Sequence, residues 1–120
     1  MPGWLTQVLE VHPLVGTEWY LAEHVDESGF GVEMQLMSAA EVLNECRNAM
    51  PGQVACRFGF IPFGKCLVGS GDPYFLKIHP ASQSASLVRV PHEISEDEME
   101  ARVELVSRAL HLFFEQAELG

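Results

Sequence analysis

Residues 54–90 decide the fold expected for this chain: VACRFGFIPFGKCLVGSGDPYFLKIHPASQSASLVRV. Four short runs rich in β-branched and aromatic side chains follow one another here, over residues 54–61, 65–68, 74–78 and 85–90. Glycine and proline separate the runs, and both residues interrupt strands and favour turns. Short strands this close in sequence predict an antiparallel meander.

The segment before the meander predicts one more strand and a helix. Residues 30–36 alternate apolar and polar side chains, which is typical of a half-buried strand. Ser38 and Glu41 have the spacing of a capping box, in which each side chain satisfies a backbone N–H of the first helical turn. The Met-Pro-Gly sequence at residues 50–52 ends that helix.

Helices are also expected at both ends of the chain. Near the N-terminus, residues 1–11 and residues 17–25 favour helices, the second capped by Thr17. Near the C-terminus, a second capping box at residues 95–98 precedes apolar residues that recur every three or four positions. These residues are Met99, Val103, Val106, Leu110, Phe113 and Ala117. The sequence therefore predicts a single α+β domain over residues 1–120: one mostly antiparallel sheet of about five strands, packed against N-terminal helices and one long C-terminal amphipathic helix.

The cysteine content predicts a reducing compartment. The chain has 120 residues and three cysteines, Cys46, Cys56 and Cys66. An odd number at wide spacing is not a disulfide framework, so we expect three small, buried, apolar side chains. Because the sequence also has neither a signal peptide nor a membrane-spanning apolar run, we expect a cytoplasmic protein.

Charge is distributed unevenly along the chain. The net charge is -10, and residues 1–46 carry eight acidic residues but no Lys or Arg. Residues 47–92 are mildly basic, and residues 93–120 again carry eight acidic residues against two arginines. The negative charge therefore disfavours nucleic acids and anionic membranes as partners, since binding to either requires clustered cations. A basic protein partner suits the two acidic ends better.

No motif for a catalytic centre, a metal or a cofactor withstands inspection. Gly69 and Gly71 suggest a phosphate-binding loop, but Tyr74 stands where the dinucleotide fingerprint needs its third glycine. We expect instead a structural turn between two strands, formed by Gly69, Gly71, Asp72 and Pro73. The five histidines show no metal-ligand spacing, so no cofactor and no catalytic residue is expected.

Several of these segments resemble the SUKH superfamily, which includes fungal Smi/Knr cell-wall-assembly regulators and many bacterial proteins. Its members typically show a Pro-hydrophobic-Gly step, which here is Pro62-Phe63-Gly64. A small-residue turn then leads to Gly71-Asp72 and an aromatic-rich strand, and a later strand ends near His92-Glu93. The resemblance covers about residues 59–93 and extends to the last helix.

The resemblance implies an α+β fold and binding rather than chemistry. Many bacterial members look like immunity proteins, which neutralise a toxin, often a nuclease with a basic active site. We therefore expect a non-enzymatic protein-binding module whose partner is a basic protein such as a nuclease-type toxin. Two alternatives stay open: a regulatory domain of a larger assembly, and a small enzyme that uses Asp72 with His79 or His92.

The acidic first 46 residues supply the candidate partner-binding residues. These are Glu18, Glu23, Asp26 and Glu27, which we expect to be exposed on a helix and its end. Acidic residues near a helix C-terminus oppose the helix dipole, so helix stability does not explain them.

Overall fold

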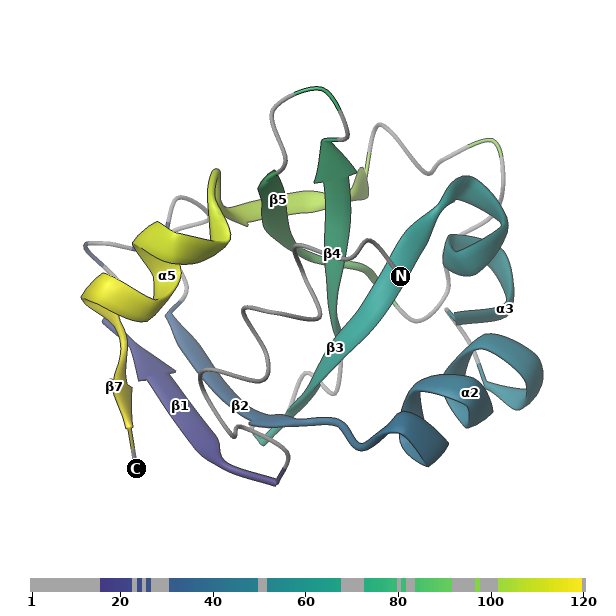
Figure 1. The fold of residues 1–120 in the computed structure, drawn as a ribbon, viewed down its shortest axis with the longest axis horizontal. Helices are drawn as coiled ribbons and strands as arrows, with labels where there is room; N and C mark the ends of the chain where they lie inside the picture. The colour runs from purple at the N-terminus through teal and green to yellow at the C-terminus, as the bar shows by residue number, and fades with distance from the viewer. Residues whose placement is uncertain are drawn as a thin grey trace.

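The computed structural model describes residues 16–22, 24, 26, 31–49, 52–67, 73–79, 81, 84–91, 97 and 102–119. Their helices and strands form an α+β fold with one antiparallel sheet (Figure 1). The expected helix over residues 1–11 lies outside the described residues.

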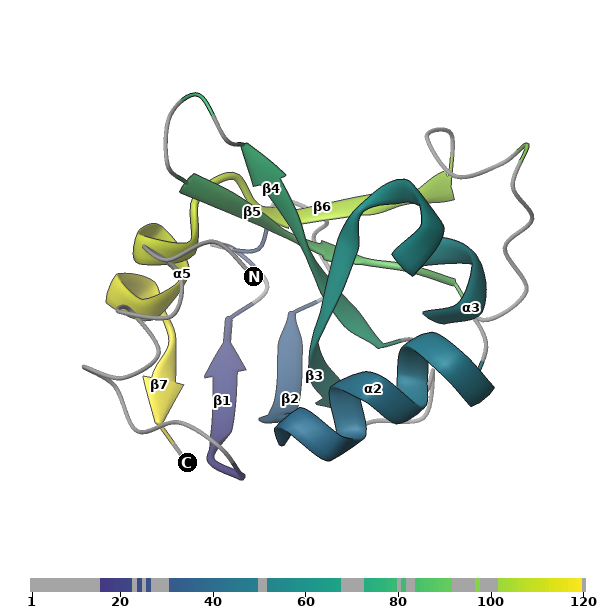
Figure 2. The same ribbon diagram turned by 45° about the vertical axis from the view of Figure 1, so that its right-hand side comes forward.

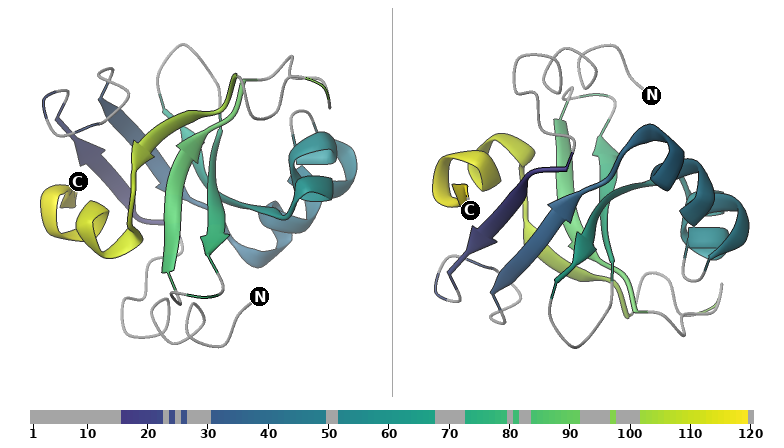
Figure 3. Two further views of the ribbon diagram at one scale, coloured as in Figure 1. Left: turned by 90° about the horizontal axis from the view of Figure 1, so that it is seen from above. Right: turned by 90° about the horizontal axis from the view of Figure 1, so that it is seen from below.

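The described residues contribute seven strands to the sheet, in the order β6-β5-β4-β3-β2-β1-β7, and each strand runs antiparallel to its neighbours. The strands are β1 (Glu18–Leu21), β2 (Val32–Leu36), β3 (Phe60–Cys66), β4 (Tyr74–His79), β5 (Ser84–Arg89), β6 (Glu104–Ser107) and the two-residue β7 (Glu118–Leu119). The predicted meander is thus confirmed, while the expected number of about five strands is too low. The sheet is curled, so that its edge strands β6 and β7 bend toward each other (Figure 3).

The long C-terminal helix predicted from residue 95 onward is wrong. Residues 104–107 form strand β6, which pairs with β5, and only the short helix α5 (Leu110–Gln116) follows it. Val106, Leu110 and Phe113 are all buried, as their spacing predicted. Pairing with β5 overrides the helical preference at residues 104–107, because strand formation depends strongly on tertiary context.

Helix α5 connects the two edges of the sheet. It follows the edge strand β6, packs against β5 and β6, and leads into β7 at the opposite edge (Figure 2). Phe113 is fully buried beneath it, and its ring centroid lies 6.3 Å from that of Trp19 on β1. The helix therefore closes the larger of two hydrophobic clusters, which fills the inner face of the curled sheet.

The second cluster lies on the other face of the sheet, which we call the outer face. Along β4 the side chains alternate: Tyr74 and Leu76 belong to the larger cluster and Phe75 belongs to the smaller one. The smaller cluster joins Phe75 to Val88 and to Ala55 of the helix α3 (Gly52–Ala55).

The capping box predicted at Ser38 is confirmed. Helix α2 (Ala39–Asn48) begins with the Glu41 N–H donating to Ser38 Oγ at 3.2 Å and the Ser38 N–H donating to Glu41 Oε1 at 3.1 Å. The strand expected at residues 54–61 is wrong in its first part. The chain there forms α3 and the 3-10 helix η1 (Cys56–Phe58), which ends at Gly59 with a φ of 84°. A short buried apolar run cannot be assigned to helix or strand from its periodicity alone.

Strand β3 continues through Pro62-Phe63-Gly64, where the sequence predicted a break. A register shift between Pro62 and Gly64 accommodates the proline, which has no N–H to donate to the ladder.

The helix predicted over residues 17–25 is wrong, because Glu18–Leu21 is strand β1. Trp19 and Leu21 face the larger cluster, so the period of this segment is two.

The expectation of three unpaired cysteines is also wrong, because Cys46 and Cys56 form a disulfide. Their Cα atoms lie 5.7 Å apart, a separation that folding of α2 against α3 creates and that sequence spacing does not reveal.

Candidate functional site

An acidic row crosses the outer face of strands β7, β1 and β2. Tyr20 is the cross-strand partner of both Glu33 on β2 and Glu118 on β7. Because cross-strand partners share a face of the sheet, the three side chains stand side by side, with the tyrosine between two carboxylates. Glu33 and Glu118 are exposed, and Tyr20 is half-buried.

Two further side chains extend this row. Glu18 lies two residues before Tyr20 on the same face of β1 and is exposed. Leu67 lies beside Glu33, to whose carbonyl it donates a backbone hydrogen bond of 2.9 Å, and its side chain is 42% exposed. We call Glu18, Tyr20, Glu33, Leu67 and Glu118 the acidic face.

The carboxylates change the chemistry of Tyr20. The negative charge of Glu18 raises the pKa of the Tyr20 phenol above its ordinary value, and partial burial and Glu33 raise it further. The phenol therefore stays neutral at physiological pH and keeps its proton as a hydrogen-bond donor. An aromatic ring surrounded by carboxylates is a surface that suits a cation or a basic side chain.

The sheet thus brings together the two acidic ends of the sequence. Glu18 and Glu33 come from the first acidic block and Glu118 from the last, and the pairing of β1 with β7 places them on one surface. In sequence Glu118 is 85 residues from Glu33, yet one residue, Tyr20, separates them across the sheet.

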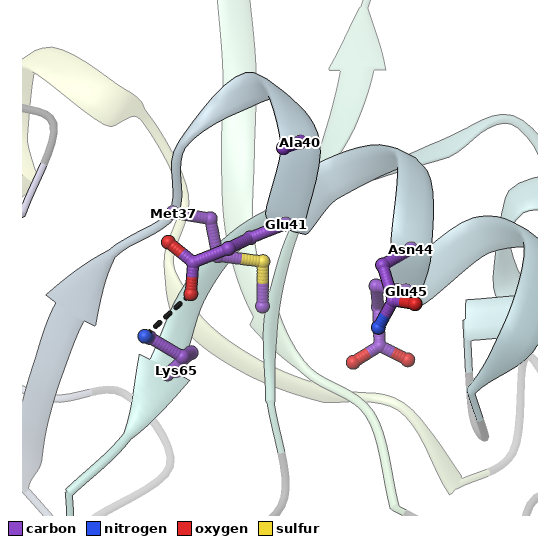
Figure 4. A pocket seen from close by; sticks show the side chains of 6 residues that line it. All are labelled: Met37, Ala40, Glu41, Asn44, Glu45 and Lys65. Carbon is purple, nitrogen blue, oxygen red and sulfur yellow. Dashed lines mark ion pairs between the residues drawn. The ribbon is translucent and has the colours of Figure 1, made fainter.

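A hollow lies beside this face, along helix α2. Its volume is about 310 Å³, near the lower limit for small-ligand pockets. It is lined by Met37, Ala40, Glu41, Asn44, Glu45 and Lys65 (Figure 4). Lys65 is connected to the acidic face through the next cross-strand row, because Gln35 pairs with both Lys65 and Glu18.

The polar groups of the hollow are already bonded within the chain. Glu41 forms a hydrogen-bonded ion pair with Lys65 (Figure 4). The hydrogen bonds that the Glu41 carboxylate accepts from Lys65 and from the Ser38 backbone hold its pKa below the ordinary value. Glu45 Oε2 accepts a 3.0 Å hydrogen bond from the Gly52 N–H, and Asn44 Oδ1 accepts one of 3.2 Å from Asn48. These oxygen atoms of the hollow are therefore already engaged as hydrogen-bond acceptors before any ligand binds.

The four predicted partner-binding residues fare differently. Glu18 is exposed as expected and belongs to the acidic face. Asp26 is buried, with its side chain 0% exposed, and pairs with Arg89, so the expectation that it would be exposed is wrong. Glu23 and Glu27 lie outside the described residues.

Of the predicted turn, only Pro73 falls within the described residues; it is buried and its carbonyl accepts a 3.1 Å hydrogen bond from the Val90 N–H. Gly69, Gly71 and Asp72 lie outside them, as does His92.

His79 is the described member of the proposed enzymatic pairs. Its Nε2 lies 2.7 Å from Ser86 Oγ, and that hydroxyl donates a 3.0 Å hydrogen bond to the carbonyl of Arg108. With its proton committed to that carbonyl, the Ser86 hydroxyl accepts from an Nε2–H of His79. This chain of hydrogen bonds joins β4, β5 and the residue after β6.

Within the described part of the chain, no three or more His, Cys, Asp or Glu side chains group closely enough to hold a metal ion. No helix among the described elements is long and apolar enough to cross a membrane.

Sequence reasoning missed Tyr20, Glu33, Leu67 and Glu118 as site residues. Alternation along residues 30–36 did place Glu33 on the polar side of a strand. Because a helix was expected at residues 17–25, the sequence did not reveal that Glu18 and Tyr20 share one face of a strand. Comparison of the chain with protein-family models, with curated proteins and with solved structures finds no significant match.

Proposed function

We propose that this chain is a non-enzymatic protein-binding module that docks a basic protein through the acidic face. The observation that carries the proposal is the row of Glu33, Tyr20 and Glu118, which joins the acidic ends of the sequence on one sheet surface. The resemblance to the SUKH superfamily supports the same reading, with a nuclease-type toxin as the basic partner. We propose the cytoplasm as its place of action.

The composition of the acidic face suits protein docking. Exposed carboxylates attract a basic partner over distances comparable with the Debye length and raise the association rate. Tyr20 and Leu67 add aromatic and aliphatic surface at the same place, and tyrosine is among the residues that most often dominate the binding energy of an interface. Glu23 and Glu27 remain proposed contributors from the segment that follows β1.

The test is a charge reversal on the sheet. We expect Glu18→Lys, Glu33→Lys and Glu118→Lys, combined in one variant, to slow association with a basic nuclease-type toxin about tenfold or more at low salt. The difference from the unmodified protein should shrink at high salt, because screening removes the steering. Toxins whose genes neighbour the gene of this protein are the first partners to test, since immunity proteins are encoded next to their toxins.

The matched control reverses one exposed charge elsewhere, Glu115→Lys on α5. Binding that is equally fast for both variants at low salt would exclude the acidic face as the docking surface. A third variant, Tyr20→Ala, separates steering from contact: it should speed dissociation and leave the salt dependence of association unchanged.

The alternative proposal is a small enzyme that uses Asp72 with His79 or His92. The contact between His79 and Ser86 favours it, because a histidine beside a hydroxyl is the arrangement of an activated nucleophile. The donation from Ser86 to the Arg108 carbonyl weighs against it. Hydrolysis of p-nitrophenyl esters or phosphates that disappears in Asp72→Ala, with the melting temperature unchanged, would overturn the non-enzymatic proposal.

A further inference from the structure

Helices α2, α3 and η1 are cross-linked by one disulfide bond. We call these three helices the clamped unit. Cys46 lies in the last turn of α2 and Cys56 begins η1, ten residues later. The disulfide between them therefore spans α3 and joins the end of one helix to the start of another.

The clamped unit stands outside the larger hydrophobic cluster. The described members of that cluster come from the strands and α5, and none comes from α2, α3 or η1. The apolar attachment of the unit to the sheet is the smaller cluster, where Ala55 is fully buried and Val54 and Cys56 are partly buried. The ion pair of Glu41 with Lys65 also ties α2 to β3. Elements attached by few buried apolar contacts can open without unfolding the rest of a protein.

Two noncovalent ties hold the same junction. Glu45 Oε2 accepts from the Gly52 N–H at 3.0 Å, and Gln53 Nε2 donates to the Arg47 carbonyl at 2.7 Å. A β-carbon on Gly52 would collide with the Glu45 carbonyl oxygen, so the backbones of the two helices approach closely at this glycine. These ties keep Cys46 and Cys56 near each other after the bond opens, which allows it to close again.

Both cysteines of the bond are half-buried, and Cys56 packs against the smaller cluster. The third cysteine, Cys66, lies on β3, remains a thiol and packs against the larger cluster. The chain therefore has one disulfide outside the larger cluster, and its remaining cysteine is a half-buried thiol on β3 that serves as a control for thiol labelling.

We propose that the Cys46–Cys56 disulfide is a reversible redox site that a dithiol reductant opens in the folded protein. One thiolate of the reductant attacks either sulfur and forms a mixed disulfide, and its second thiol then displaces the cysteine. The products are two protein thiols and one oxidised reductant, so two electrons and two protons pass to the protein. In a reducing compartment, a disulfide of this kind is a sensor rather than a permanent staple.

Opening the disulfide affects the hollow beside the acidic face as well as the packing of the helices. Asn44 and Glu45, the two residues before Cys46, line the hollow beside the acidic face. Reduction therefore loosens one wall of the hollow. The proposed redox site concerns the clamped unit itself, and it holds whether or not the acidic face docks a partner.

The experiment treats the folded full-length chain with excess dithiothreitol in the absence of denaturant. Alkylation followed by mass spectrometry should report two new thiols, at Cys46 and Cys56. Hydrogen exchange should show amide protection lost in residues 42–49 and 52–58 by up to roughly 100-fold, the effect of releasing a ring of this size. Amides of β4 and β5 should keep their protection, and re-oxidation with an oxidised dithiol should restore that of the helices.

Two variants serve as controls. Cys66→Ser should respond like the unmodified chain, and the double variant Cys46→Ser with Cys56→Ser should show the reduced exchange pattern without any reductant. A bond that resists dithiothreitol until β4 and β5 also exchange would overturn the proposal. Unchanged protection of residues 42–49 and 52–58 after complete reduction would overturn it equally.

Discussion

The guanidinium of Arg89 lies 3.7 Å from the carboxylate of Asp26, measured from Nη2 to Oδ2, and both side chains are buried. The same nitrogen donates to the Gly31 carbonyl at 2.9 Å, and Nη1 contacts Glu104 Oε2 at 3.4 Å. The guanidinium carbon also lies 5.2 Å from the centre of the Tyr74 ring. Arg89 thus ties Asp26 and Gly31, which lie between β1 and β2 in sequence, to strands β4, β5 and β6.

This buried pair predicts a large loss of stability when one member is removed. Arg89→Met should lower the free energy of unfolding by about 3–5 kcal/mol, because it leaves the Asp26 carboxylate buried without its cation. Adding Asp26→Leu to that variant should recover part of the loss, since the unpaired charge is then gone. Urea denaturation of both variants measures this, and a double variant less stable than Arg89→Met would contradict it.

The packing of α5 predicts that Phe113 is a central core residue. Phe113 is 0% exposed and its ring contacts those of Trp19 and Phe114. Phe113→Ala should cost about 3–5 kcal/mol and lower the melting temperature by many degrees. His111→Ala, at an exposed position of the same helix, is the control and should change stability by less than about 0.5 kcal/mol. Equal melting temperatures for the two variants would rule out the observed packing.

Gly64 predicts a steric requirement within β3. A β-carbon at this position would lie 2.5 Å from Met34 Sδ and 3.3 Å from Met34 Cβ, and Met34 is fully buried. Gly64→Ala should therefore cost about 1–3 kcal/mol through overpacking. Met34→Val in the same chain should restore some of the lost stability, because it shortens the side chain that clashes. Chemical denaturation checks both, and a stability unchanged by Gly64→Ala would show that Met34 has room to move.

At the N-terminus of α2, we expect the capping side chain of Ser38 and the charge of Glu41 to contribute separately to stability. Ser38→Ala removes the cap and should cost about 1 kcal/mol at neutral pH. Glu41→Gln keeps a residue able to complete the capping box but loses the charge that pairs with Lys65.

The charge effect has a defined pH dependence. Because the pKa of Glu41 is lowered on folding from its ordinary value of 4.5, its charge stabilises the fold above that pH. The stability difference between the unmodified protein and Glu41→Gln should disappear as pH falls below this value. A difference that persists at pH 2 in thermal unfolding would contradict the assignment.

Local patterns predicted those elements whose sequence period was unambiguous. The capping box at Ser38 and Glu41 begins α2, the alternation of residues 30–36 forms β2, and the runs at residues 74–78 and 85–90 form β4 and β5. In each case the local preference and the tertiary contacts agree. Where the apolar spacing fits two periods, as at residues 103–113, partner strand β5 decides the outcome.

The sequence by itself determined that the chain is acidic at both ends, that an antiparallel meander occupies its middle, and that Ser38 caps the start of α2. Only the tertiary structure decided that β1 pairs with β7, which places Glu118 beside Tyr20 and Glu33, and that Asp26 is buried beside Arg89. The same is true of the bond between Cys46 and Cys56. The physical reason is common to all three: caps and periodicity act within a few residues, whereas these contacts join groups that become neighbours only when the sheet curls and the helices pack.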